Sequence, residues 1–546
     1  MTEWWRGGVI YQVYPRSFQD SNGDGIGDLP GIIDRLDYIA SLGVDCIWLS
    51  PITRSPQADM GYDVSDYIDV DPLFGSLQDF DSLIEGAHAR GLKVIMDQVV
   101  SHTSDQHPWF RESAVSRNNA RADWYVWAEA NPDGTPPNNW LSVFGGSAWE
   151  WHTGRRQYYL HNFLTSQPDL NFHNPAVQDA IIDVMRFWLD RGLDGFRLDT
   201  VNYYFHDAQL RSNPPLPLVE GAPPMVNPYD MQSHQYSKSQ PENLGWLRRV
   251  RALLDEYPGA TSVGEVGDDE RGVELMAAYT AGSEMLHMCY SFDFLGPKFS
   301  AHHFRSKLEA FFETGPDGWP CWSFSNHDVI RHATRWSSFS ASQADLIRQS
   351  AALVMTLRGS VGLYQGEELG LPEADILYEE LTDPRGIRFW PGDKGRDGCR
   401  TPMPWQSGTP HAGFTSGTPW LPVKATHSAL NVAAQEADPD SSLAYYRKIL
   451  GWRRNHPAML TGDIEFFDTD EPVLAWRRTA GNKDFICVFN LSPEPRVVAL
   501  EGVELALEPI SNNADLAGAS LGLGPNGFAI LPAPAGEGRV IYNSAD

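Results

Sequence analysis

The sequence contains few cysteines and no long apolar segment. Five cysteines occur in 546 residues, and none of them forms a Cys-x-x-Cys pair, so neither a disulfide framework nor a thiolate metal site is expected. No run of 18 apolar residues is present, and the first residues lack the basic and apolar regions of a secretory signal. We therefore expect a soluble, cytoplasmic protein without a membrane partner.

Basic residues are also scarce, whereas aromatic residues are abundant. The chain has 42 Lys plus Arg against 71 Asp plus Glu, a formal net charge of -29, which repels phosphate backbones and argues against nucleic acid as a partner. Aromatic residues make up 12% of the chain and include 19 tryptophans, which can pack a core or form platforms for sugars. Composition leaves that choice open, together with the choice between a monomer and a homodimer.

Short apolar runs alternate with longer segments of helical periodicity, a pattern typical of repeated β-α units around a parallel sheet. Eight such runs occur, at residues 9–18, 46–51, 93–99, 195–200, 261–266, 285–294, 320–328 and 360–369. Eight units of this kind close naturally into a TIM barrel, so we predict an α/β fold of the (β/α)8 type.

Two connections are too long for plain loops, and the end of the chain changes pattern. Residues 103–172, between the third and fourth runs, are rich in Trp, Asn, Pro and Gly and indicate an inserted domain. Residues 201–240 form a second, Pro-rich insert over the same end of the barrel. From residue 458 alternating strands predict a C-terminal antiparallel β domain, 458–546. The barrel then comprises residues 1–102 and 173–457.

Several apolar runs end in acidic residues or histidine. In such barrels chemistry lies at the C-terminal ends of the strands, and the polar residues there are Asp97, His102, Arg197, Asp199, Glu265, Asn326, His327 and Asp328. A single acid at a strand end is more often a helix cap or a surface charge. A cluster of ionisable groups on apolar strands is costly unless the groups pair or react, so together they predict an active site.

Two carboxylates on neighbouring strands are what glycoside hydrolysis requires, one to attack the anomeric carbon and one to protonate the leaving oxygen. Arg197 lies two residues before Asp199 and therefore on the same face of the strand. We expect it to keep Asp199 ionised, whereas Glu265 beside other carboxylates should have a raised pKa and hold a proton.

With these segments identified, nearly the whole chain resembles glycoside hydrolase family 13, the α-amylase family, and within it the branch of exo-acting α-glucosidases and oligo-1,6-glucosidases. The matching motifs are DQVVSH (97–102), GFRLDT (195–200), GEV (264–266), NHD (326–328), QPDLNF (167–172), GYDVSDY (61–67) and GRDGCRTPMPW (395–405). The resemblance implies a (β/α)8 barrel with a B domain inserted after the third strand and a C-terminal β domain.

The resemblance also implies a role for each acid of the cluster. Asp199 is expected to be the nucleophile of a retaining double displacement, Glu265 the general acid/base and Asp328 the stabiliser of the transition state. The retaining mechanism requires the carboxyl groups of Asp199 and Glu265 to lie roughly 5 to 5.5 Å apart.

Further residues are expected from the resemblance to contact substrate. His102 and His327 would hydrogen-bond the glucose at the cleavage point, Arg197 would orient the nucleophile, and Tyr62 would stack on the sugar ring. Asp63 and Arg400 would form an ion pair that closes the pocket at the non-reducing end and makes the enzyme exo-acting.

The preferred linkage follows from the residue after the nucleophile. In this branch Val there accompanies α-1,6 preference, and a smaller or more polar residue accompanies α-1,4 preference, so Thr200 favours maltose-like substrates. Phe144 and Phe163 could line the pocket, although packing within the B domain is nearly as good an explanation. The insert 201–240, beside the nucleophile strand, could wall off the leaving-group side and restrict substrates to disaccharides.

A metal site is expected in the loop that follows the first run. Asp20, Asn22, Asp24 and Asp28 alternate with glycines, so hard oxygen ligands can converge on Ca²⁺ or Mg²⁺; the resemblance adds the carbonyl of Ile26. The alternative is an Asp/Gly turn without an ion. A second calcium site known in the amylases is not expected, because Ser101 stands where those enzymes have the ligating Asn. No organic cofactor is indicated.

Rival functions remain open at this stage. A non-catalytic relative, such as the heavy chains of amino-acid transporters, is disfavoured because the three acids are present and no membrane span is found. A glucosyltransferase, a sucrose-cleaving enzyme, an oligo-1,6-glucosidase or a maltose-trehalose isomerase would share the same covalent intermediate, and the motifs do not separate them.

Overall fold

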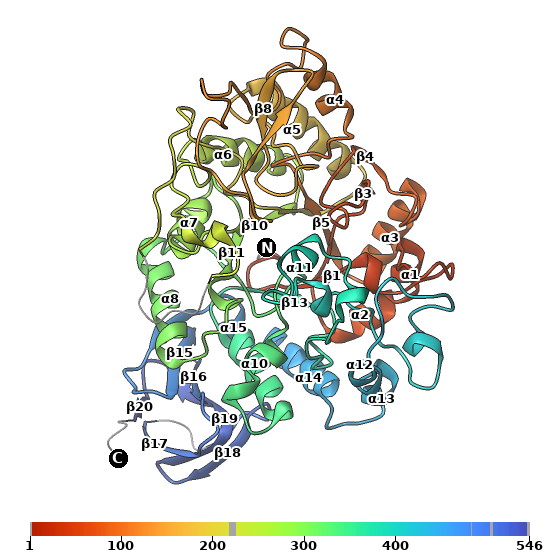
Figure 1. The fold of residues 1–546 in the computed structure, drawn as a ribbon. Coiled ribbons are helices and arrows are strands. Elements are labelled where there is room, and N and C mark those ends of the chain that lie inside the picture. The colour runs from red at the N-terminus through yellow and green to blue at the C-terminus, as the bar shows by residue number, and fades with distance from the viewer. Residues whose placement is uncertain (1–2, 218–224, 482, 503–505, 543–546) are drawn as a thin grey trace.

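The computed structural model describes residues 3–217, 225–481, 483–502 and 506–542. Its centre is an all-parallel barrel of eight strands (Figure 1), paired in the order β11-β10-β9-β5-β2-β1-β13-β12. The strands are β1 (Val9–Val13), β2 (Cys46–Leu49), β5 (Lys93–Gln98), β9 (Gly195–Leu198), β10 (Thr261–Val266), β11 (Met288–Ser291), β12 (Cys321–Ser323) and β13 (Ser360–Tyr364). A parallel bridge between Cys289 and Pro320 closes the barrel between β11 and β12.

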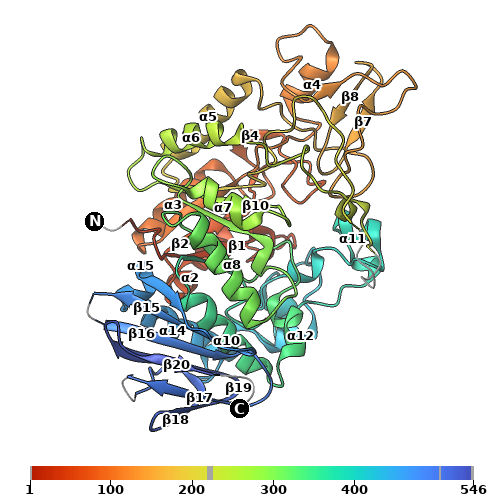
Figure 2. The ribbon, with the colours of Figure 1, turned by 90° about the vertical axis from the view of Figure 1, so that its left-hand side faces the viewer.

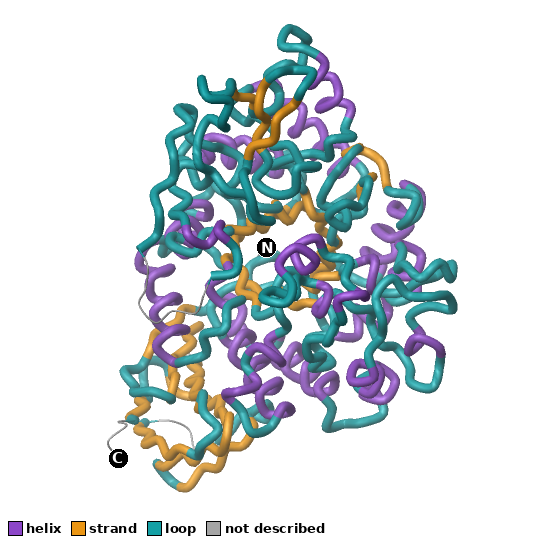
Figure 3. Tube along the Cα trace, viewed as in Figure 1, coloured by secondary structure: helices purple, strands orange, loops and turns teal. Residues whose placement is uncertain are grey.

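Helices cover the outside of the barrel, as Figure 3 shows. They are α1 (Leu29–Asp34), α2 (Leu36–Leu42), α3 (Leu77–Ala89), α5 (Pro175–Asp190), α6 (Asn243–Leu254), α7 (Gly272–Thr280), α8 (Ala301–Thr314) and α10 (Gln343–Thr356), with α14 (Ser442–Arg454) packed against α10. Local sequence explains their starts: Ser76 and Asp79 form a capping box at α3, and the Asn174 side chain caps α5 ahead of Pro175. The first two helices, α1 and α2, are separated only by a break at Arg35.

The insert after β5 forms a domain above the barrel (Figure 2). It contains α4 (Pro108–Val115) and a three-stranded sheet in the order β6-β8-β7, from β6 (Trp127–Ala128), β7 (Trp149–His152) and β8 (Gln157–Leu160). The insert 201–240, described here without residues 218–224, packs against this domain: Trp140 donates to the carbonyl of Arg211 (2.8 Å), and Asn227 donates to the carbonyl of Val143 (2.8 Å).

The C-terminal part is an antiparallel sheet with its own apolar core. Its strands are β14 (Asp463–Phe466), β15 (Val473–Ala480), β16 (Lys483–Asn490), β17 (Arg496–Glu501), β18 (Asn512–Ala517), β19 (Ser520–Pro534) and β20 (Arg539–Ile541). The remaining short elements are β3 (Thr53–Arg54), β4 (Asp66–Val70), α9 (His332–Arg335), α11 (Pro384–Phe389), α12 (Ala425–Ala429), α13 (Val432–Glu436) and α15 (Pro457–Thr461). The expected fold class, a TIM barrel with an insert after the third strand and a C-terminal β domain, is confirmed. No helix among the described residues is long and apolar enough to cross a bilayer.

Candidate active site

The guanidinium of Arg197 lies at the centre of the acidic cluster. It comes from β9, is fully buried, and donates through Nη1 to Asp97 and to Asp199, both at 2.6 Å. Its Nη2 forms an ion pair with Glu265 at the end of β10. One cation therefore serves three carboxylates from three neighbouring strands, which keeps the acids close together in a dry environment.

Glu265 is held by two further donors. The backbone N–H of Thr200 donates to Oε2 (3.0 Å), and the Tyr290 hydroxyl from β11 donates to Oε1 (2.8 Å) while accepting from Arg197 (2.7 Å). Thr200 has φ 41, a left-handed conformation that is unfavourable for a β-branched residue. This strained turn directly follows the expected nucleophile Asp199 and aims its N–H at the expected acid.

Asp328 lies on the opposite side of the pocket among cations. Its Oδ1 accepts from Arg400 (3.0 Å) and Arg396 (3.3 Å), and its Oδ2 lies 3.2 Å from Nε2 of His327. Nδ1 of His327 accepts from the Gln12 amide at 2.8 Å, so its Nε2 carries the proton.

Tyr62 links this side to Asp97. Its hydroxyl receives the Nε2 proton of His327 at 2.5 Å and donates to Asp97 at 3.0 Å, and its ring stacks on the His327 ring with centroids 5.2 Å apart. His102 is similarly fixed, since Nε2 donates to the carbonyl of Tyr62 (2.8 Å) and Nδ1 bonds Ser101 (2.8 Å). Both ring nitrogens of His102 thus already have protein partners.

Burial sets the protonation of the central acids. It raises the pKa of both Asp199 and Glu265 to about 7, against the lowering effect of Arg197, and raises the pKa of Asp97 to about 6. We expected Asp199 to be ionised and only Glu265 to be protonated. This contrast is not found, because the pKa values of both groups are raised and the three carboxylates share one guanidinium. For Asp328 burial is outweighed by His327 and the arginines, which lower its pKa well below the usual range.

The ion pair expected between Asp63 and Arg400 does not form. Asp63 is buried and accepts from the Ser55 hydroxyl (2.8 Å) and from the backbone N–H groups of Ala58 (2.9 Å) and Asp59 (3.0 Å). Arg400 donates to the His327 carbonyl (2.7 Å) and to Asp328. Neither residue lines the pocket, so the assignment of this pair was wrong; both side chains brace the segments that carry pocket residues.

The pair that does form in this part of the pocket is Asp59 with Arg396, at 2.7 Å. Both residues stand four positions before the expected ones, Arg396 inside the motif 395–405 and Asp59 two residues before the motif 61–67. Arg396 also pairs with Asp383 at 2.7 Å, and its guanidinium lies 5.1 Å from the centre of the Phe144 ring. Asp59 and Arg396 line the cavity, so the pair can close one end of it.

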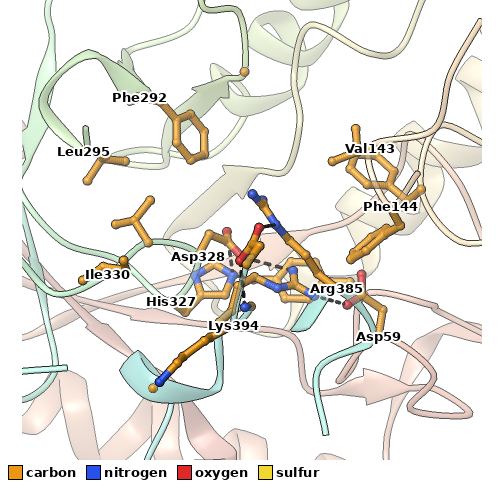
Figure 4. Close-up of a pocket in the computed structure, with 18 of the residues that line it drawn as sticks. Asp59, Val143, Phe144, Phe292, Leu295, His327, Asp328, Ile330, Arg385 and Lys394 are labelled. Atoms are coloured by element: carbon orange, nitrogen blue, oxygen red, sulfur yellow. Dashed lines mark hydrogen bonds and ion pairs between the residues drawn. The ribbon is translucent and has the colours of Figure 1, made fainter. Parts of the chain in front are cut away.

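A cavity of about 840 Å³ contains these groups (Figure 4). The expected residues that line it are Asp199, Glu265, Asp328, Tyr62, His102, Thr200, His327, Phe144 and Phe163. Arg197 lies beneath it and has no exposed surface. Phe292, Leu295 and Ile330 form an apolar wall on the side away from Phe144 and Asp59, so a ligand meets charge at one end and apolar surface at the other.

Three segments distant in sequence meet over the mouth of this cavity. Val143 comes from the inserted domain, Val226 from the insert 201–240, and Arg385 from α11. The inserted domain and α11 fit closely, because a Cβ added at Gly145, which has φ 87, would lie 2.7 Å from the Phe389 ring. The mouth is therefore narrowed by loops rather than by the barrel.

The loop expected to bind metal is compact and rich in oxygen. Asp20 is buried and accepts from the N–H groups of residues 22, 23 and 25, Asn22 accepts from the N–H of Asp24 (2.8 Å), and Asp24 accepts from that of Ile26 (2.8 Å). Asp28 caps α1. No three Asp, Glu, His or Cys side chains of the described chain converge as a metal site. The donor set suits a hard cation only if the Asn22 amide and the Ile26 carbonyl contribute.

The sequence argument missed several residues of the site. Arg396 stands inside a quoted motif and Asp59 two residues before one, but neighbours of the same type were chosen instead. Tyr290 lies in the sixth apolar run, where an aromatic residue is normally assigned to the hydrophobic core. Gln12 and Asp383 carried no signal, because only the fold places them beside His327 and Arg396.

Comparisons with known proteins agree with this geometry. A family model described as the catalytic domain of alpha amylase matches residues 12–462. A protein named "Probable alpha-glucosidase" from Rhizobium meliloti is 58% identical over 496 residues, covering 90% of each chain, and an oligo-1,6-glucosidase from Heyndrickxia coagulans is 38% identical over 528 residues, covering 90% of this chain and 93% of that one.

Solved structures also match over almost the full length. An alpha-glucosyl transfer enzyme, XgtA, has a TM-score of 0.94 at 54% identity and covers 98% of this chain and 100% of its own. Trehalulose synthase MutB from Pseudomonas mesoacidophila has a TM-score of 0.86 at 31% identity, with 97% and 100% covered. This chain belongs to the α-amylase family, glycoside hydrolase family 13, and is a glycoside hydrolase.

Proposed function

We propose that the enzyme is a retaining exo-α-glucosidase that releases glucose from the non-reducing end of short α-glucosides, with maltose-like α-1,4 bonds preferred. Asp199 attacks the anomeric carbon, and Glu265 protonates the leaving oxygen and then deprotonates the acceptor. Asp328 stabilises the positive charge that develops on the sugar ring. The observation that carries the proposal is the buried Asp199–Arg197–Glu265 cluster opposite the Asp59–Arg396 pair.

The protonation of the cluster supports this assignment. With the pKa of both Asp199 and Glu265 near 7, the pair holds about one proton at neutral pH, as a nucleophile and an acid acting together require. Glu265 differs from Asp199 in its hydrogen-bond donors. The Tyr290 hydroxyl and the Thr200 N–H hold Glu265 in a fixed orientation for proton transfer.

Substrate recognition is proposed to begin at the charged end of the pocket. The Asp59 carboxylate and the Arg396 guanidinium can bond the hydroxyls of the terminal glucose, while His327, His102 and Tyr62 bond or stack against the same ring. Small glucosides such as maltose, and sucrose as an alternative, fit a pocket with one such end. The relatives are named both as α-glucosidases and as oligo-1,6-glucosidases, so they do not decide the linkage.

Thr200 is proposed to favour the α-1,4 bond. Its hydroxyl lies 3.0 Å from that of Ser101 and 3.4 Å from Asp199, beside the bond to be cleaved. The variant Thr200→Val removes this polar contact, and we expect the ratio of kcat/KM for isomaltose to that for maltose to rise by about tenfold. An unchanged ratio would refute the role of Thr200.

The insert 201–240 is proposed to limit substrate length. An antiparallel bridge between Pro215 and Gln232 forms the base of its outer part, so residues 216–231 can be replaced by a short Gly-Ser turn without opening the base. We expect the shortened enzyme to gain on maltotetraose relative to maltose. No gain would contradict the proposed wall.

Glucosyl transfer is proposed as a second outcome of the same intermediate. The XgtA structure is described as that of an alpha-glucosyl transfer enzyme, and the apolar wall of Phe292, Leu295 and Ile330 is a poor site for ordered water. Transfer products should therefore increase with maltose concentration.

Anomer-resolving NMR on maltose, isomaltose, sucrose and trehalose tests the main proposal. α-Glucose is expected as the first product, with maltose turned over faster than isomaltose. Release of β-glucose first would contradict retention, and faster turnover of isomaltose would overturn the linkage assignment.

Cellular location and cation binding are also proposals. A cytoplasmic enzyme is consistent with five buried cysteines, all of them free thiols. The loop 20–28 is proposed to hold one structural Ca²⁺ or Mg²⁺ ion.

A further inference from the structure

A second cavity, of about 430 Å³, lies at the opposite end of the barrel from the active site. Its walls come from segments that immediately precede β1, β11, β12 and β13, together with the ends of α6 and α7. Glu3 near the start of the chain lines this cavity, and Figure 2 shows the start of the chain on the side away from α11, which contributes Arg385 to the other cavity. None of its lining residues takes part in the active site described above.

Three arginines line this cavity in a chain with a net charge of -29. Arg6 is paired with Glu3 at 2.6 Å, and Arg251 is paired through Nε with Asp255 at 2.7 Å, on the exposed side of α6. Among the described residues, Arg358 forms one ion pair, a long contact of 3.7 Å to Asp463.

The carboxylates that face the cavity are fewer than its cations. They are Glu3 and Asp317, and Glu3 is already bound to Arg6. Nη1 of Arg251 donates to the carbonyl of Met285 (3.0 Å) and Nε to Asp255, which leaves Nη2 without a hydrogen-bond partner among the described residues. Three guanidiniums and two carboxylates therefore line the cavity.

His287 adds a neutral donor. It is 6% exposed, and its Nδ1 lies 3.1 Å from the Ser262 hydroxyl, which in turn accepts the His287 backbone N–H at 3.1 Å. When the hydroxyl proton points to Nδ1, the ring proton is on Nε2, where no described residue accepts it. Burial and the neighbouring Arg251 and Arg6 lower the pKa of His287 to about 3, which keeps the ring in this neutral form.

The terminal N–H groups of Arg358 have weak partners. Its Nη2 reaches the carbonyl of Pro316 at 3.5 Å, and its Nη1 lies 3.7 Å from Asp463. The aromatic rings of Phe312 and Trp319 hold the guanidinium in place, at 4.6 and 5.8 Å. Unused N–H groups on fixed cations require an acceptor, and leaving them without one costs free energy.

We propose that this cavity is a binding site for a phosphate group, either free or carried by a small sugar. Arg251 and Arg358 supply charge-assisted hydrogen bonds, and Nε2 of His287 supplies a neutral one. A tetrahedral oxyanion has enough acceptor oxygens to use all three. The volume admits a phosphorylated monosaccharide as well as inorganic phosphate.

Calorimetric titration of the full-length enzyme with inorganic phosphate, at constant ionic strength in chloride buffer, tests the site. We expect saturable binding that Arg251→Gln and Arg358→Gln each weaken by about tenfold or more. Arg248→Gln is the matched control, because Arg248 lies on the same helix but contacts Glu284 at 3.6 Å and does not line the cavity. Equal weakening by all three changes, or no saturable binding, would overturn the proposal.

Two further measurements keep the test decisive. If an arginine variant folds poorly, the test instead compares the ³¹P NMR line broadening of phosphate by the wild type with that by His287→Phe. Broadening that persists in His287→Phe contradicts the site. Glucose 6-phosphate binding more tightly than phosphate assigns the cavity to a sugar phosphate, whereas equal affinity assigns it to free phosphate. Saturating glucose, which occupies the active site, should leave both affinities unchanged; competition would place the phosphate in the active site instead.

Discussion

The active-site pocket has two halves that treat their carboxylates in opposite ways. The Arg197 half contains Asp97, Asp199 and Glu265, and the Arg396 half contains Asp59, Asp328 and Asp383 with Arg400. In the first half one guanidinium is shared by three acids, and burial raises their pKa values. In the second half two guanidiniums serve three acids, and the pKa values of Asp328 and Asp383 are lowered.

The difference separates reactivity from recognition. Proton transfer needs a carboxyl group whose pKa lies near the working pH. This condition is met where carboxylates outnumber the cations that would keep them ionised. Binding of sugar hydroxyls and stabilisation of a cationic transition state need carboxylates that stay ionised, which requires enough positive charge. Both conditions are met within one cavity because the arginines come from different elements, β9 and the segment after α11.

The largest effect is expected from the Arg197 half. Asp199→Asn removes the attacking carboxylate, so kcat on maltose should fall by about 10⁴-fold or more, with a smaller change in KM. Steady-state kinetics with a glucose-release assay measures this. Asp179→Asn on α5, an exposed aspartate paired with Arg249, is the control and should be neutral. Undiminished activity of Asp199→Asn would disprove the assignment.

The second prediction concerns the Arg396 half and the wrongly expected pair. A double-mutant cycle with Asp59→Asn and Arg396→Gln should give a coupling of about 1–3 kcal/mol in kcat/KM, because the two charges touch and face substrate. The same cycle with Asp63→Asn and Arg400→Gln should give a coupling within about 0.5 kcal/mol. The reverse ranking would restore the pair expected from the motifs.

These two pairs also show how far sequence reasoning reaches. Strand ends and motifs located the acidic cluster around Arg197, because acids that follow apolar runs can be recognised in the sequence. They could not distinguish Asp59 from Asp63, because both are buried carboxylates. The two differ in their partners: backbone N–H groups donate to Asp63, whereas Arg396 pairs with Asp59. Tyr290 could not be found at all, because a hydroxyl that faces two catalytic groups looks like any core tyrosine until the strands are paired.

A third prediction sharpens the Arg197 half through its pH dependence. The reaction needs Asp199 ionised and Glu265 protonated, so kcat/KM should be bell-shaped with both limbs near neutrality. Tyr290→Phe removes a hydrogen bond that favours the ionised form of Glu265, which raises the pKa of that group. The alkaline limb should therefore move upward by about one pH unit.

The control for this shift is a tyrosine outside the reacting pair. Tyr204→Phe removes a hydroxyl that donates to the backbone carbonyl of Asp199 (3.1 Å) and should leave the alkaline limb in place. A downward shift in Tyr290→Phe, or the same shift in both variants, would contradict the proposed role of Tyr290 in setting the pKa of Glu265.

The smallest effect is expected from the loop 20–28, which lies outside both halves of the pocket. If it holds Ca²⁺, saturating Ca²⁺ at about 100 times its Kd adds about 2.7 kcal/mol to the free energy of unfolding, which raises Tm by about 2 °C in a chain of this size. Asp24→Asn should abolish the rise measured by calorimetry. Asp66→Asn is the matched control, because Asp66 likewise accepts a backbone N–H two residues on (3.0 Å) but lies on β4. If the Tm of the wild type does not depend on Ca²⁺ or on chelator, the loop is an Asp/Gly turn without an ion. If Asp24→Asn still shows the rise in Tm, the ion binds elsewhere.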